Sequence, residues 1–248
     1  GNCKLLIATG CLAQGYSEDL AKEIPELDAI LGTGKFDQIV EVIEESLGGT
    51  RKVEVSKPDF DYDRELPKIS LGKGHTTYVK VAEGCNNYCS YCVIPKLRGG
   101  LKSRSIENIV KEVENLADQG VKEINIIAQD ITQYGIDLYD EPKLVELLTE
   151  LVKIEKIDWF RLLYAYPRRI SDELIELIAS EDKICNYLDL PVQHADSEIR
   201  EKMNRSGTKE EILAVVNKLR AKIPNIALRT SLIVGFPGET EKHFSNLL

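Results

Sequence analysis

Residues 78–92, YVKVAEGCNNYCSYC, place three cysteines directly after a short apolar run. Tyr78–Val81 is predicted to form a β-strand, and the polar residues between the cysteines are typical of a compact turn. Cys85, Cys89 and Cys92 follow a C-x3-C-x2-C spacing. The three thiols are therefore expected in a loop at the carboxyl end of a strand, where α/β folds bind their ligands.

This spacing favours an iron-sulfur cluster. A 4Fe-4S cube needs thiolates that converge from a short loop, and three ligands leave one iron open for chemistry. The plainer interpretations are a zinc site or three incidental thiols. Structural zinc sites use four ligands in two pairs, and no further Cys or His lies close to this segment.

Outward from the cysteines, apolar strand-like runs alternate with amphipathic helical patterns. Repeated βα units predict a parallel sheet of an α/β protein, either curled toward a barrel or doubly wound. Thr208 and Glu211 form the signature of a helix capping box. The predicted strands are Tyr78–Val81, Glu123–Ala128, Trp159–Tyr164, Tyr187–Leu190 and Ile226–Val234.

The chain is predicted to divide into three parts. Residues 1–49 combine one short strand, at 4–9, with two helical patterns, at 18–24 and 36–47, as in a small α/β piece. Residues 50–77 lose the apolar periodicity and are interpreted as a linker, and residues 78–248 carry the repeated units. The start at Gly1 and the end at Leu248 suggest a fragment of a longer chain.

Composition narrows the functional classes. Of the 248 residues, 43% are hydrophobic and 29% charged, with no apolar run that could span a membrane and no secretion signal. We therefore expect a soluble, cytoplasmic protein that does not bind membranes. The net charge of -9 argues against stable binding of duplex nucleic acid and suits a basic partner.

The cysteine segment resembles that of the radical S-adenosylmethionine (SAM) superfamily. Three other stretches, IPKLRGGLKSRSIENI (94–109), IIAQDITQYGIDLY (126–139) and LRTSLIVGFPGET (228–240), resemble the methylthiotransferases of that superfamily. The resemblance implies a partial TIM-type barrel preceded by the remnant of a small α/β N-terminal domain. It also implies SAM at the open iron and reductive cleavage of SAM to a 5′-deoxyadenosyl radical.

The same resemblance implies a set of SAM-binding residues. Some of them have a plain structural explanation. A residue at the end of a strand can be simple core, and the tight turn around Pro237 explains Gly235 and Gly238 without any ligand. His194 is interpreted as structural, with binding of a substrate carboxylate as the second interpretation, and Cys185 as a buried apolar residue. The implied SAM contacts are Tyr91, Gln129, Gln193, Ile233 and Gly235.

Two segments distinguish the branches of the family. Gln193-His194-Ala195-Asp196-Ser197 and Ala128-Gln129-Asp130 resemble the branch that modifies the β-carbon of an aspartate in the twelfth small-subunit ribosomal protein. The alternatives are the branch that modifies isopentenyladenosine in tRNA and, from another class, an iron-sulfur electron carrier or scaffold. The expected partners are a ribosomal protein and an electron donor such as flavodoxin.

A second 4Fe-4S cluster is implied for the full-length chain only. Gly10-Cys11-Leu12-Ala13-Gln14 resembles the segment that bears the last ligand of that cluster, so Cys11 is its candidate ligand. The other two ligands are missing from this sequence, because Cys3 does not match a family ligand position. Within this chain the second cluster is therefore expected to be incomplete.

Overall fold

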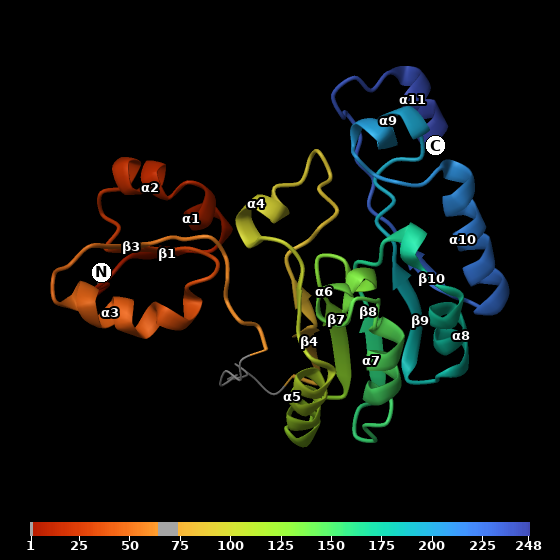
Figure 1. Ribbon diagram of the computed structural model, residues 1–248, viewed down its shortest axis with the longest axis horizontal. Helices are drawn as coiled ribbons and strands as arrows, with labels where there is room; N and C mark the ends of the chain where they lie inside the picture. The colour runs from red at the N-terminus through yellow and green to blue at the C-terminus, as the bar shows by residue number, and fades with distance from the viewer. Residues whose placement is uncertain (1, 64–73) are drawn as a thin grey trace. The chain divides into compact units, whose positions relative to one another are not determined.

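A computed structural model of the chain describes residues 2–63 and 74–248. It contains two compact units (Figure 1). The first unit comprises Gly1–Asp61, Gly84–Asn86 and Cys92–Gly100, and the second comprises Tyr62–Glu83, Asn87–Tyr91 and Leu101–Leu248. In this division Cys85 and Cys92 belong to the first unit, and Cys89 belongs to the second.

The first unit is built on a small parallel sheet. Its strands are β1 (Ile7–Thr9), β2 (Ala29–Leu31) and β3 (Lys52–Glu54), with β2 in the centre. Ile30 packs with Ala13 on one face of β2, whereas Ala29 and Leu31 pack with Val42 on the other. This two-sided burial follows from the alternation of side chains along a strand. The helices are α1 (Cys11–Gly15), α2 (Ser17–Glu23), α3 (Ile39–Leu47) and α4 (Ile94–Arg98), with a 3-10 turn η1 at Phe36–Gln38.

The segment predicted as a linker, residues 50–77, contains a β-strand near its beginning. Residues 52–54 form β3 and complete the first sheet, although their sequence, KVE, has only one apolar residue. An edge strand needs only one buried face, so few of its residues must be apolar. With three residues, the apolar pattern is too short to detect. Part of the predicted linker, residues 64–73, lies outside the described residues.

The second unit contains a five-stranded parallel sheet. Its strands follow one another in chain order across the sheet: β4 (Thr76–Lys80), β7 (Glu123–Ile127), β8 (Trp159–Leu162), β9 (Ile184–Asp189) and β10 (Ala227–Arg229). Figure 1 shows these strands side by side, with helices between them in the chain. Such a sequential parallel order, with no reversal, is that of a TIM-type barrel and not of a doubly wound sheet.

Each strand of this sheet leads into a helix. The main helices are α5 (Ile106–Asp118), α7 (Leu144–Leu151), α8 (Asp172–Ser180), α10 (Lys209–Lys222) and α11 (Glu241–Leu247). The predicted capping box of α10, between Thr208 and Glu211, is confirmed. Shorter elements occupy the strand carboxyl ends: the antiparallel pair β5 (Ala82–Glu83) and β6 (Lys102–Ser103), α6 (Ile136–Tyr139), α9 (Ser197–Lys202), and the 3-10 turns η2 (Ile131–Gln133) and η3 (Pro167–Arg169).

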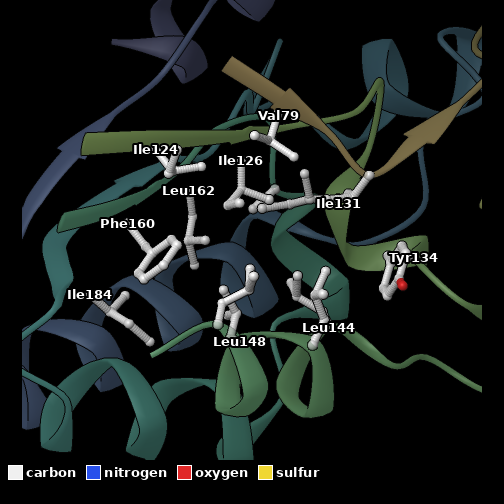
Figure 2. Close-up of a cluster of buried hydrophobic side chains, with 14 of the residues drawn as sticks. Val79, Ile124, Ile126, Ile131, Tyr134, Leu144, Leu148, Phe160, Leu162 and Ile184 are labelled. Carbon is white, nitrogen blue, oxygen red and sulfur yellow. The ribbon is translucent and has the colours of Figure 1, made fainter. Parts of the chain in front are cut away.

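The core of the second unit lies between the sheet and its helices (Figure 2). Ile124, Ile126, Phe160 and Leu162 alternate along β7 and β8 and are fully buried against the leucines of α7. Burial of each such side chain stabilises the fold by roughly 1.5–3 kcal/mol. The core thus fixes the sheet, and the loops at its carboxyl edge rest on a rigid support. No helix in the described part of the chain is long and apolar enough to cross a membrane.

Candidate functional site at the carboxyl ends of the strands

The cysteine segment begins with a sharp turn after β5. Gly84 has φ +74, and a Cβ atom at this position would lie 2.1 Å from the carbonyl oxygen of Gly100. Only glycine allows this close approach. Cys85 and Cys89 are buried and Cys92 is half-buried, and none of the three forms a disulfide with another described residue.

The part of the segment in the first unit is held by α4. The backbone N–H of Cys85 donates to the Gly99 carbonyl at 3.2 Å, just after that helix. The hydroxyl of Thr33, in the loop after β2, donates to the carbonyl of Leu97 at 2.7 Å. The residues that follow Cys92 therefore contact the loop after β2 and helix α1, which the sequence did not predict.

In the second unit, residues 202–205 form a platform for the part of the segment at 87–91. Ser90 donates from its N–H to the carbonyl of Met203 at 3.0 Å and from its hydroxyl to that of Lys202 at 2.7 Å. The Asn204 amide donates to the carbonyl of Tyr88 at 2.8 Å. These bonds join positions more than a hundred residues apart, so no local pattern could reveal them.

Asp130 anchors the same part of the segment from the end of β7. Its buried carboxylate accepts hydrogen bonds from the side chains of Asn87 at 2.8 Å, Arg169 at 2.8 Å and Gln133 at 2.9 Å, and from the N–H of Thr132. A carboxylate held by several donors is a strong fixed point. The Ala128-Gln129-Asp130 segment thus contributes a structural anchor of the cysteine loop.

The predicted SAM residues Gln193 and Ile233 lie together. Gln193 takes up φ +69 and forms an isolated parallel bridge beside Leu232. Its carbonyl accepts from the N–H of Ile233 at 2.7 Å, and its N–H donates to the carbonyl of Ser231 at 2.9 Å. The chain after β9 and the chain after β10 therefore run side by side at this point, beyond the strand ends.

Gln129 and Tyr91 are placed differently. The Gln129 amide donates to the buried carboxylate of Glu83 at 2.5 Å, while its oxygen is buried without an acceptor bond among the described residues. Burial raises the pKa of Tyr91 to about 12, although the Arg205 guanidinium, 3.3 Å from its hydroxyl, opposes that shift. The SAM roles of these two residues and of Gln193, Ile233 and Gly235 stay predictions.

His194 has a structural role. It is fully buried; its Nδ1 accepts from the N–H of Asp196 at 3.0 Å, so its Nε2 carries the proton and faces Glu239 at 3.3 Å. The Glu239 carboxylate also accepts from the N–H groups of Gly235 and Phe236, at 2.6 and 3.0 Å. Both ring nitrogens are therefore occupied, and a substrate carboxylate cannot reach them.

Glu239 is the centre of this turn, and its ionisation should matter for stability. Burial raises the pKa of its carboxyl, but the donors Phe236, His194 and Gly235 outweigh burial and hold the pKa below its usual range. A group with a depressed folded-state pKa stabilises the fold above its unfolded pKa of about 4.3 and ceases to do so as the pH falls through the folded pKa.

We therefore expect Glu239→Gln to lower the free energy of unfolding at pH 7, and the difference from the wild type to shrink toward pH 3. Urea unfolding of both proteins at the two pH values measures this. Glu201→Gln, which neutralises an exposed carboxylate on α9, is the control and should leave the unfolding free energy nearly unchanged. An equal loss for Glu239→Gln at both pH values would contradict the expectation.

The remaining cysteines lie apart from this loop in the sequence. Cys11 begins α1 in the first unit and is half-buried, and Cys3 donates to the carbonyl of Leu5. Cys185 lies on β9, where burial raises the pKa of its thiol. Among the described residues, no three Cys, His, Asp or Glu side chains are arranged as a ready metal site.

The donor set of the loop nevertheless fits an iron-sulfur cluster. It offers three cysteine side chains outside any disulfide, two of them buried, and thiolate is the ligand that such clusters require. The guanidinium of Arg205 lies 3.7 Å from the sulfur of Cys89, and its Nε is buried with no partner among the described residues. Sequence reasoning missed Arg205; its only local signal is the turn-prone Asn204-Arg205-Ser206-Gly207 after a helix.

Comparison with known proteins identifies the family. The model of the radical SAM superfamily matches residues 79–248, which include the complete cysteine segment. This chain belongs to the radical SAM superfamily. Within the superfamily it is 53% identical over 249 residues to the ribosomal protein uS12 methylthiotransferase RimO of Syntrophotalea carbinolica, covering 100% of this chain and 55% of that protein. It is 50% identical over 248 residues to the RimO of Clostridioides difficile, covering 100% and 56%.

This superfamily member thus spans about half the length of the curated relatives that it matches. Among solved structures, the radical SAM methyltransferase TsrM of Kitasatospora setae, with tryptophan and a SAM analogue, matches with a TM-score of 0.69 and 17% identity, over 97% of this chain and 52% of that one. The cobalamin-dependent radical enzyme OxsB also matches with 0.69, at 14% identity over 96% and 38%. These likenesses confirm the expected partial TIM-type fold.

Proposed function

We propose that this chain carries the catalytic barrel of a methylthiotransferase that modifies the β-carbon of an aspartate in ribosomal protein uS12. The observation that supports it most is the identity of about one half, along the whole chain, to proteins that bear the name uS12 methylthiotransferase. The intact C-x3-C-x2-C loop at the strand carboxyl ends agrees with this activity.

In this proposal Cys85, Cys89 and Cys92 hold a 4Fe-4S cluster. Bound there together with SAM, the cluster supplies a carbon radical strong enough to attack an unactivated C–H bond. The task of the protein is then to hold the loop rigid, to orient SAM and to keep water out. Asp130 and residues 202–205 do the first, because they fix the loop through hydrogen bonds to Asn87, Tyr88 and Ser90.

The paired chain ends at Gln193 and Ile233 are the proposed support for SAM. Their mutual backbone bonds leave the side chains of both residues half-buried at the carboxyl edge of the sheet. Gly235, which follows, has φ +81 and open space around the position of a Cβ atom. A ligand can therefore approach the backbone closely there.

Arg229, and not His194, is suited to bind an anionic group of the substrate. Arg229, the last residue of β10, donates one guanidinium nitrogen to Asp189 at 3.3 Å and remains 58% exposed. Asp189 ends β9 and is 1% exposed, with a second oxygen that has no partner among the described residues. An exposed guanidinium at the ligand-binding edge, held in place by a buried carboxylate, fits the carboxylate of an aspartyl residue.

Cys11 belongs to the proposal as one ligand of a second cluster, which only the full-length protein completes. The chain offers no ligand set of three around Cys11 within its described residues. The resemblance to methylthiotransferases implies that insertion of sulfur requires the second cluster. Cleavage of SAM requires only the barrel cluster. A flavodoxin-type protein is the proposed electron donor.

The test is mass spectrometry of purified uS12 and of tRNA after anaerobic reaction with the reconstituted full-length enzyme, SAM and a reductant. We expect a methylthio group on one aspartate of uS12 and none on tRNA. The chain alone should cleave SAM to 5′-deoxyadenosine and transfer no methylthio group. A uS12 variant with alanine at the target aspartate is the control. Modified tRNA with unmodified uS12 would refute the substrate, and absence of SAM cleavage would refute the enzyme.

A further inference from the structure

Arg205 is a buried cation without an anionic partner. It is 8% exposed, and its hydrogen-bond partners among the described residues, Pro191, Cys89 and Tyr91, include no carboxylate. One nitrogen, Nη2, donates to the carbonyl of Pro191 at 2.7 Å, and the guanidinium lies 4.4 Å from the ring centre of Tyr166. These neighbours are neutral, so they do not compensate the charge that was taken out of water.

The other terminal nitrogen points at the cluster loop. Nη1 lies 3.7 Å from the sulfur of Cys89 and 3.3 Å from the hydroxyl of Tyr91. Hydrogen bonds to ligand sulfurs and nearby charges are the main means by which a protein sets the potential of an iron-sulfur cluster. Since the site is buried, the effect of one charge is much larger than in water.

We propose that Arg205 sets the reduction potential of the cluster through a charged hydrogen bond to the sulfur of Cys89. The proposal rests on the cluster proposed above. Arg205 is a positioning residue in this sense, because it acts through Cys89 and not on the substrate. The reduced cluster carries one more negative charge than the oxidised one, so a fixed positive charge stabilises the reduced form more. Arg205 therefore raises the potential and makes reduction easier.

The absence of a carboxylate near Arg205 supports this direction. A guanidinium paired with Asp or Glu would be neutral as a pair and would add little to the field at the sulfur. Arg161 provides the contrast within the same unit, because its Nε bonds to the Glu123 carboxylate at 2.7 Å and its guanidinium stacks 5.1 Å from the centre of the Tyr187 ring. Arg161 thus has its counterion, whereas the counterion of Arg205 is the cluster.

The experiment measures the midpoint potential of the reconstituted holoprotein by redox titration followed with electron paramagnetic resonance. Arg205→Gln should lower the ratio of reduced to oxidised cluster at a fixed potential by about tenfold, which is a shift of about 59 mV to more negative values for one electron. Arg205→Lys keeps the charge and should shift less. Arg161→Gln removes one positive charge that is already paired and should leave the potential unchanged.

A second measurement detects the proposed contact directly in the wild type. Arginine labelled with ¹⁵N in the wild-type holoprotein should show weak hyperfine coupling to the reduced cluster, and Arg205→Lys should remove it. Wild-type potential in Arg205→Gln with full iron, or no arginine coupling in the wild type, would overturn the inference. Failure of the wild type to bind iron would refute the proposed cluster itself, so the two failures are distinguishable.

Discussion

Replacement of Cys85, Cys89 or Cys92 by alanine is expected to remove most of the iron that the reconstituted chain binds. The wild-type chain should hold about four irons, because one three-cysteine set with an open iron carries one 4Fe-4S cube. Each variant leaves only two thiolates, and two ligands cannot hold the cube against exchange with solvent. Iron and sulfide analysis, together with the visible absorption of the cluster, measures the loss.

Cys185→Ala is the matched control for these variants. It also removes one thiol, but Cys185 is a half-buried residue on β9 with a raised pKa and is not part of the loop. Its iron content should equal that of the wild type. Near-full iron retention after simultaneous replacement of all three loop cysteines would disprove the assignment of the cluster site.

Gly84→Ala is expected to abolish cluster binding without touching a ligand. An alanine Cβ would lie 2.1 Å from the Gly100 oxygen and 2.8 Å from the Gly99 oxygen, both backbone atoms that cannot rotate away. The φ of +74 adds about 1 kcal/mol of strain for any residue with a Cβ atom. The turn must therefore open, which displaces Cys85, and the loss of stability should exceed ~3 kcal/mol. Iron content and urea unfolding both report the change.

Gly120→Ala separates the clash from the backbone strain. Gly120 has φ +93, yet its Cβ position has no atom within 4 Å. This variant should lose about 1 kcal/mol of stability and keep its iron. If Gly84→Ala lost no more stability than Gly120→Ala and bound iron normally, the close approach of Gly84 to the carbonyl groups of Gly99 and Gly100 would be disproved.

Periodicity predicted the parts of the fold that have long apolar patterns. Amphipathic helices were predicted between the strands, and α5 is one of them, with Ile109, Val113 and Leu116 buried along one face. The strands of the second sheet lie near their predicted positions. The strands β2 and β3 were missed because three residues are too few to show alternation. The sequential order of the second sheet also required the structure, since local patterns do not encode which strands pair.

The candidate site also combines features that the sequence predicted with features that only the structure revealed. The spacing of the three cysteines and their place after a strand are local, so the sequence revealed them. The supports of the loop are not local: Asp130 reaches Asn87 across 43 positions, and Arg205 reaches Cys89 across 116. His194 was interpreted correctly as structural, but its partner Glu239, 45 positions away, became visible only in the fold.

The distance between Cys89 and Arg205 along the chain has a consequence for biosynthesis. Strands that neighbour each other in the second sheet also follow each other in the chain, so each can pair soon after it leaves the ribosome. The platform at 202–205 is complete only with Arg205, 116 residues after Cys89, which is roughly 6 to 23 seconds at ordinary rates of translation. During that interval the part of the loop at 87–91 lacks this platform. Iron is therefore best loaded after synthesis, by a donor that meets the finished domain and not the nascent chain.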